Sequence, residues 1–204
     1  MKHLYKDKIT ALHQLLSKDT SLKLQSFFTG QAASPALLDK FGLSGAIRDF
    51  YAELNGWQLS YVAETNADFK QKEFGTYSAA FPWMWPNENY WHLDGCINIL
   101  PLEVMMENNW EGYLWFKTEK EYSIDYKGKK MLQQEFEKKL KPLDVFSKSS
   151  IAVVYPDKGN FDVLLSSDHN ASYTDFPEID FETYFEGLIK TKGDSNKRRD
   201  IFKN

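Results

Sequence analysis

The side chains that could perform chemistry stand apart from one another in this sequence. The four histidines, His3, His13, His92 and His169, have no second histidine within four positions, whereas metal motifs usually bring ligands that close together. Cys96 lies inside an apolar run, where a cysteine usually packs as a small hydrophobic residue and does not act as a nucleophile. The sequence therefore predicts no metal site and no catalytic residues.

One tripeptide, Asp168-His169-Asn170, could be a fragment of a nuclease site or an acid–base pair. It follows an expected strand and precedes Ala171 and Ser172, so a polar turn is the preferred interpretation. The sequence contains neither a Gly-rich phosphate loop nor a Gly-x-Ser-x-Gly nucleophile elbow. An enzyme is accordingly the least favoured class of function.

The most unusual local feature is the segment 81–92, which gathers five aromatic residues around two prolines. If the chain is extended there, Trp83 and Trp85 project from the same face. Together with Tyr90 and Trp91 they could form a platform for a protein or a sugar, because Trp and Tyr dominate binding hot spots. The alternative is a long loop that packs its aromatic side chains onto the domain, and the sequence leaves both interpretations open.

Acidic residues are concentrated in two blocks. Residues 50–116 contain nine acidic and two basic residues, and residues 157–189 contain eight acidic and one basic. Such blocks argue against direct nucleic-acid binding, which uses a basic stripe, and they suit a basic protein partner, although acidic surfaces also keep proteins soluble. The basic tail 194–204, with Lys197, Arg198 and Arg199, is expected to be a solvated end.

Length and composition indicate one globular domain that positions these residues. The chain has 204 residues, of which 16% are aromatic and 26% are charged, which excludes a disordered tail, a coiled coil and a collagen-like repeat. Its single cysteine favours a reducing compartment. The first eight residues lack the apolar core of a signal peptide, and no apolar run approaches the roughly 20 residues that span a bilayer. We therefore expect a cytoplasmic protein without a membrane segment.

Hydrophobic periodicity predicts the elements of this domain. A helical period predicts helices over about 3–17, 35–41 and 45–54, and the clearest helix is expected to begin after Asp180 and to end at Gly193. Strands are expected at 57–61, 96–100 and 114–116, and as a hairpin of 151–155 with 161–165. Weaker helical patterns cover 102–106 and 129–141. This order predicts an α+β fold with N-terminal helices, an antiparallel sheet with helices packed on one side, and a closing C-terminal helix.

The order and spacing of several motifs resemble the SUKH superfamily, the Smi/Knr type of domain named after a fungal cell-wall regulator. The motif F-Y-x-x-x-N-G (50–56) leads into Trp57, and G-x-I-x-I-L-P-L (95–102) follows. A tryptophan at 110, the expected hairpin and the aromatic closing helix complete the pattern. The resemblance covers about 34–193 of a single domain 1–204, with insertions at about 64–92 and 117–141.

The resemblance implies an α+β fold without catalytic residues or a cofactor. It also implies that bacterial members are mostly immunity proteins, which bind and neutralise a cognate polymorphic toxin such as a nuclease, whereas fungal members are regulatory scaffolds. A bacterial immunity protein with a basic protein partner is thus the leading hypothesis. An intracellular regulatory module and, less favoured, a carbohydrate-binding protein remain the alternatives.

In the leading hypothesis, carboxylates mimic phosphates in the substrate groove of the toxin while tryptophans fill a pocket. The partner-binding residues expected on this basis are Trp83, Trp85, Glu88, Tyr90, Trp91, Asp94, Glu107 and Glu111.

Overall fold

The structure is a computed structural model that describes residues 4–66, 93–108, 110, 123–146, 150–156, 161–167 and 177–203. Its helices are α1 (Leu4–Ser17), α2 (Pro35–Lys40), α3 (Gly45–Glu53), α4 (Leu102–Glu107), α5 (Gln133–Glu137), α6 (Phe181–Thr191) and the 3₁₀ helix η3 (Ser195–Phe202). Its strands are β1 (Leu22–Thr29), β2 (Trp57–Ala63), β3 (Gly95–Ile99), β4 (Ser123–Tyr126), β5 (Lys129–Leu132), β6 (Lys141–Asp144), β7 (Ser150–Val154) and β8 (Val163–Ser167).

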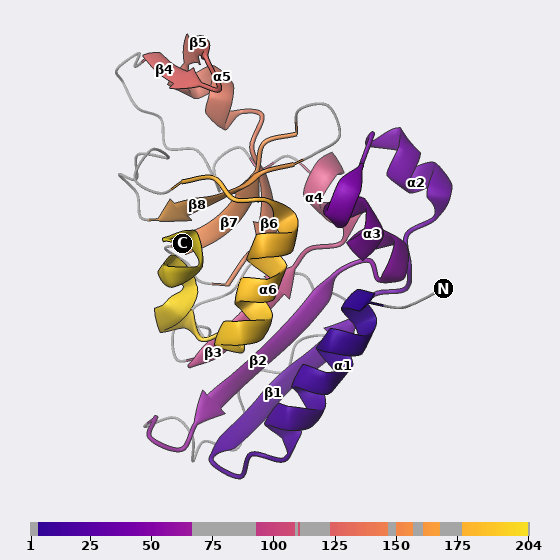
Figure 1. The fold of residues 1–204 in the computed structure, drawn as a ribbon, viewed down its shortest axis with the longest axis vertical. Coiled ribbons are helices and arrows are strands. Elements are labelled where there is room, and N and C mark those ends of the chain that lie inside the picture. The colour runs from indigo at the N-terminus through magenta and orange to yellow at the C-terminus, as the bar shows by residue number, and fades with distance from the viewer. Residues whose placement is uncertain are drawn as a thin grey trace.

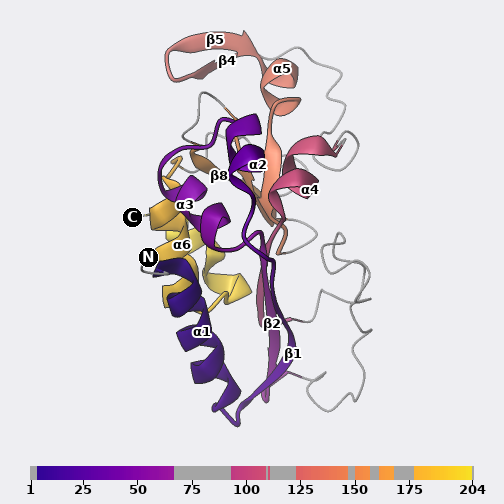
Figure 2. The same ribbon diagram turned by 90° about the vertical axis from the view of Figure 1, so that its right-hand side faces the viewer.

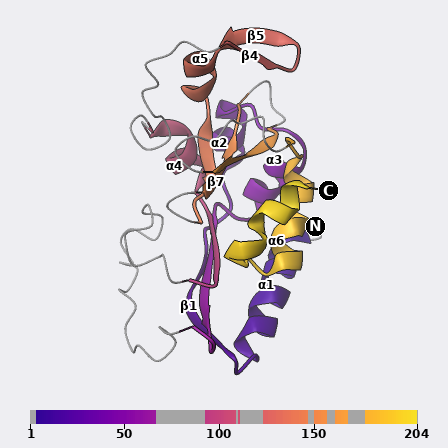
Figure 3. The ribbon, with the colours of Figure 1, turned by 90° about the vertical axis from the view of Figure 1, so that its left-hand side faces the viewer.

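Six strands form one antiparallel sheet in the order β1-β2-β3-β6-β7-β8, and β4 and β5 form a separate two-stranded sheet (Figure 1). Figures 2 and 3 show α1, α3 and α6 together on one face of the large sheet. The predicted α+β class, with an antiparallel sheet, helices on one side and a closing helix, is confirmed.

Helices α1, α2 and α6 begin where side chains satisfy the free N–H groups of their first turns. The Glu53 carboxylate accepts three N–H groups at the start of α1, with N–O distances of 2.9, 2.9 and 3.0 Å. Ser34 Oγ accepts the N–H of Leu37 in α2 at 3.2 Å, and Asp180 Oδ1 accepts the N–H of Thr183 in α6 at 2.7 Å. The Glu53 contacts also fix the start of α1 against the end of α3.

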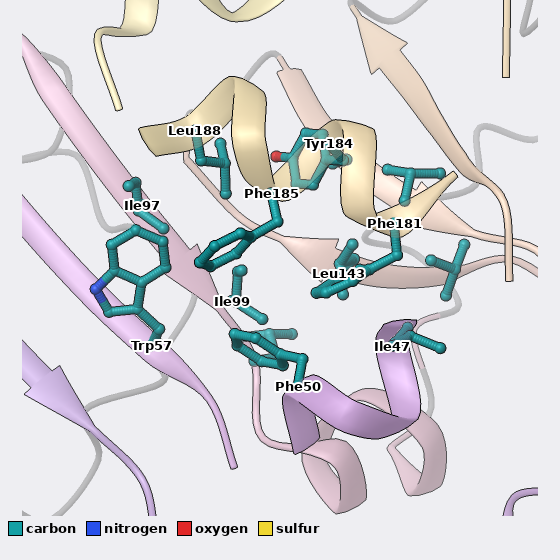
Figure 4. Close-up of a cluster of buried hydrophobic side chains, with 14 of the residues drawn as sticks. Ile47, Phe50, Trp57, Ile97, Ile99, Leu143, Phe181, Tyr184, Phe185 and Leu188 are labelled. Carbon is teal, nitrogen blue, oxygen red and sulfur yellow. The ribbon is translucent and has the colours of Figure 1, made fainter. Parts of the chain in front are cut away.

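An aromatic cluster fills the space between the helices and the sheet. Figure 4 shows Phe50 of α3, Phe181 and Phe185 of α6 and Trp57 of β2 converging on one volume. The Phe50 ring centroid lies 5.2 Å from that of Phe181 and 6.0 Å from that of Phe185, and Trp57 lies 5.8 Å from Phe185. All four side chains are at most 1% exposed, so this cluster forms the centre of the core.

The predicted hairpin is also confirmed, because β7 and β8 pair antiparallel from Ser150 opposite Ser167 to Val154 opposite Val163. The predicted strand at 57–61 exists as well. Its residues alternate between apolar and polar, a pattern typical of a half-buried strand, yet the strand is buried on both faces. Gln58 and Ser60, on the face away from the helices, are 1% and 0% exposed. Both faces of β2 are therefore covered.

One other prediction was wrong, and one strand was missed. The segment 129–141 is not one helix: β5, α5 and the start of β6 share it. The strand β1 was not predicted at all, yet it pairs with β2 along its whole length. The expected strand at 114–116 lies outside the described residues.

The tail 194–204 is not a solvated end. Residues Ser195–Phe202 form η3, in which Arg198, Ile201 and Phe202 are 1%, 4% and 0% exposed. Lys192 and Gly193, with φ of 56° and 73°, turn the chain between α6 and η3. The packed core thus includes residues of α1 and of η3.

Candidate functional site

The structure describes two of the eight residues predicted to bind a partner. Trp83, Trp85, Glu88, Tyr90, Trp91 and Glu111 lie outside the described residues, so their role stays a prediction.

The two described carboxylates, Asp94 and Glu107, do not form a common site. Asp94 precedes β3, and its Oδ2 accepts the N–H of Ala63 at 2.7 Å and the Nδ2 of Asn66 at 3.0 Å. Glu107 ends α4 and forms an ion pair with Lys40. Asp94 therefore anchors the turn after β2. Of these two carboxylates, Glu107 is the exposed one.

A different acidic surface lies on the outer side of α6, where an open hollow has a volume of about 630 Å³. It is lined by Asp180, Glu182, Thr183, Glu186, Gly187, Lys190 and Ile201. We call this the α6 hollow. Three carboxylates and one lysine make its lining acidic.

The amphipathic pattern of α6 directs these side chains outward. Because Phe181, Tyr184, Phe185 and Leu188 are buried against the core, residues 182, 186 and 190 share the opposite face. On one flank, a Cβ added at Gly187 would lie 2.5 Å from Ile201 Cγ2. The missing side chain at Gly187 therefore lets η3 approach α6 and form a wall of the hollow.

The carboxylates around α6 produce a negative potential that reaches the neighbouring helices. Lys8 of α1 forms an ion pair with Glu186, and α3 adds Asp49 and Glu53 nearby. Burial, together with Glu182, Asp49, Glu53 and Glu186, raises the pKa of Tyr5 to about 12. The hydroxyl of Tyr5 is thus an internal reporter of this acidic surface.

We expect the double variant Glu182→Gln/Glu186→Gln to lower the pKa of Tyr5, because neutral amides no longer disfavour the tyrosinate. The pKa should stay above its ordinary value of about 10, since burial is the largest cause of the shift. NMR titration of ring-labelled tyrosine measures it, with Tyr5→Phe assigning the signal and Glu135→Gln on α5 as the control. An unchanged pKa in the double variant would contradict this electrostatic description.

The sequence contained a signal for this surface. The acidic block 157–189 includes Asp180, Glu182 and Glu186, and the buried positions of the closing helix define its outer face. Nothing in the sequence indicated that Ile201 lines this hollow, because the segment that forms η3 was expected to be solvated.

The described residues offer little for metal or nucleophilic chemistry. Among them, no three His, Cys, Asp or Glu side chains are grouped to hold a metal ion. His13 stacks on Phe27 with ring centroids 3.8 Å apart. Cys96 is 1% exposed, and burial raises the pKa of its thiol to about 12, so it packs as a small hydrophobic residue as predicted. Asp168-His169-Asn170 lies outside the described residues.

In the described part of the chain, the helices are too short or too polar to cross a membrane. Comparisons of the chain with protein-family models, with curated proteins and with solved structures found no match.

Proposed function

We propose that this chain is a non-catalytic immunity protein of the SUKH type, which binds and neutralises a basic toxin in the cytoplasm. The observation that carries the proposal is the α6 hollow, where Asp180, Glu182 and Glu186 line a concave surface. A concave acidic surface is complementary to arginine and lysine side chains in the substrate groove of a nuclease-like toxin. The resemblance in motif order described above supports the same class.

The carboxylates of the hollow differ in their availability to a partner. Asp180 is held by Thr183, whose N–H and Oγ1 donate at 2.7 and 2.8 Å. Glu182 and Glu186 are exposed, and Glu186 is paired with Lys8. Exposed ion pairs contribute little to stability, so a partner's cation can replace Lys8 at small cost. We therefore assign recognition mainly to Glu182 and Glu186.

The direct test is co-expression with the toxin encoded by the neighbouring gene. Cells that carry the wild-type protein should survive. The variant Glu182→Lys/Glu186→Lys should protect poorly, because its two lysines repel the basic side chains of the toxin. Colony counts after toxin induction measure the effect. Glu182 lies in the first turn of α6 and Glu186 pairs with Lys8, so the variant should lose about 1 kcal/mol of stability per site and stay folded, which thermal denaturation checks.

A matched control carries the same charge change elsewhere. The variant Glu64→Lys/Glu135→Lys also reverses two exposed carboxylates, at the turn after β2 and on α5, and it should protect like the wild type. Failure of the wild-type protein to protect cells would contradict the proposal. Equal loss in both double variants would point to net charge and not to the α6 hollow.

A further inference from the structure

The side chain of Arg198 lies in a closed pocket built by segments far apart in the sequence. Its Nη1 is 3.0 Å from Asp144 Oδ2 and donates to the hydroxyl of Tyr184 at 3.1 Å. Its Nη2 donates to the carbonyl oxygen of Cys96, and its guanidinium carbon lies 4.4 Å from the centre of the Phe146 ring. We call these four partners the arginine pocket.

The carboxylate at the base of the pocket is held in place by groups other than Arg198. Asp144 Oδ1 accepts the N–H of Asn98 at 2.7 Å, and its Oδ2 accepts the hydroxyl of Tyr184 at 2.7 Å. These donors come from β3 and α6, both parts of the main core. The acceptors for a cation therefore stay oriented when the Arg198 side chain is removed.

The chemistry of the pocket fits a planar guanidinium better than an ammonium. A carboxylate, a hydroxyl oxygen and a carbonyl oxygen surround the edge of the plane, and an aromatic ring covers one face. Guanidinium groups donate from a fixed planar fork and stack on aromatic rings, whereas an ammonium is a compact and strongly hydrated charge. The pocket selects by shape as well as by charge.

Arg198 belongs to η3, the last helix that the structure describes. η3 is an eight-residue 3₁₀ helix, longer than the three or four residues typical of this geometry. It is joined to α6 by residues in left-handed conformations.

We propose that the arginine pocket is a guanidinium-binding site, which Arg198 fills within the chain and which accepts an alkylguanidinium from solution when that side chain is missing. This inference is independent of the proposed toxin binding.

The test is chemical rescue of the variant Arg198→Ala in the full chain. Ethylguanidinium reproduces the arginine side chain beyond Cβ, so it should raise the melting temperature of the variant saturably, by about 3–5 °C at ten times its dissociation constant. Propylammonium, which lacks the planar fork, should give no saturable rise. The wild type and Arg199→Ala, which alters the exposed neighbour, should not respond to either compound.

If Arg198→Ala is unfolded at 25 °C, the same titration is followed at 10 °C as recovery of the native circular dichroism spectrum. Recovery with ethylguanidinium and not with propylammonium supports the proposal at either temperature. The proposal is overturned if neither measurement shows a saturable effect, or if propylammonium is equally effective.

Discussion

Replacement of Arg198 by alanine should lower the free energy of unfolding by about 3–5 kcal/mol, since removal of one partner of a buried ion pair leaves the other charge uncompensated. Arg198 and Asp144 are 1% and 0% exposed, and burial leaves little water to solvate the remaining carboxylate. Burial opposes the charge of Arg198, but Asp144 and Tyr184 outweigh it, so that the pKa of the guanidinium is raised. Urea denaturation of the wild type and of Arg198→Ala measures the difference.

Arg199→Ala is the matched control for this prediction. The neighbouring arginine is exposed, so its loss should change stability by no more than about 0.5 kcal/mol. A similarly small change for Arg198→Ala would contradict the conclusion that η3 is a packed part of the core.

Replacement of Phe50 by alanine is the second large effect, with an expected loss of about 3–5 kcal/mol. The Phe50 ring is fully buried and packs against Tyr5, Tyr51, Phe181 and Phe185, with ring centroids between 5.2 and 6.0 Å. Its removal leaves a cavity between α1, α3 and α6 that these elements cannot close without losing other contacts. Thermal or urea denaturation measures the loss.

Leu15→Ala provides the comparison on an exposed apolar side chain. Leu15 lies on α1 and is 54% exposed, so its truncation should cost well under 1 kcal/mol, as surface changes usually do. If Phe50→Ala were equally mild, the aromatic cluster would not be the main packing unit of the helical layer.

Elements with local, regular patterns were predictable from the sequence. The period of Phe181, Tyr184, Phe185 and Leu188 defines α6, and Asp180 begins it as expected. Helix α1 follows in the same way from its stripe of buried residues. In both cases the signal lies within one element, and the tertiary structure only buries the face that the sequence already marks.

The elements that were not predicted depend on irregular or distant contacts. The alternation of Leu22 and Leu24 in β1 breaks at a bulge between Leu24 and Ser26, and a bulge shifts the two-residue period of a strand. The spacing in 129–141 suggested a helix, but its first residues, Lys129–Leu132, pair with β4 across the turn at Lys127 and Gly128, which have φ of 52° and 76°.

The buried state of Arg198 could not be read from local sequence either. Its neighbours Lys197 and Arg199 are exposed, and three basic residues in a row are typical of a solvated segment. Its partner Cys96 lies 102 positions earlier in the sequence. For the candidate site the acidic block 157–189 was visible, but the residues expected to bind a partner were all taken from the block 50–116, and none of them lines the α6 hollow. The contacts of Asp94 could not be foreseen either, because its hydrogen bonds to Ala63 and Asn66 exist only in the folded chain.

The central claim is that the acidic outer side of α6 binds a basic protein, and calorimetric titration of the purified chain with the proposed toxin partner tests it most directly. We predict a complex that weakens as salt rises from 50 to 300 mM, because salt screens exposed charges. Glu182→Lys/Glu186→Lys should raise the dissociation constant by about 100-fold or more, roughly tenfold for each lost pair. Glu64→Lys/Glu135→Lys should leave it unchanged. No complex, or a complex equally tight with both double variants, would contradict the claim.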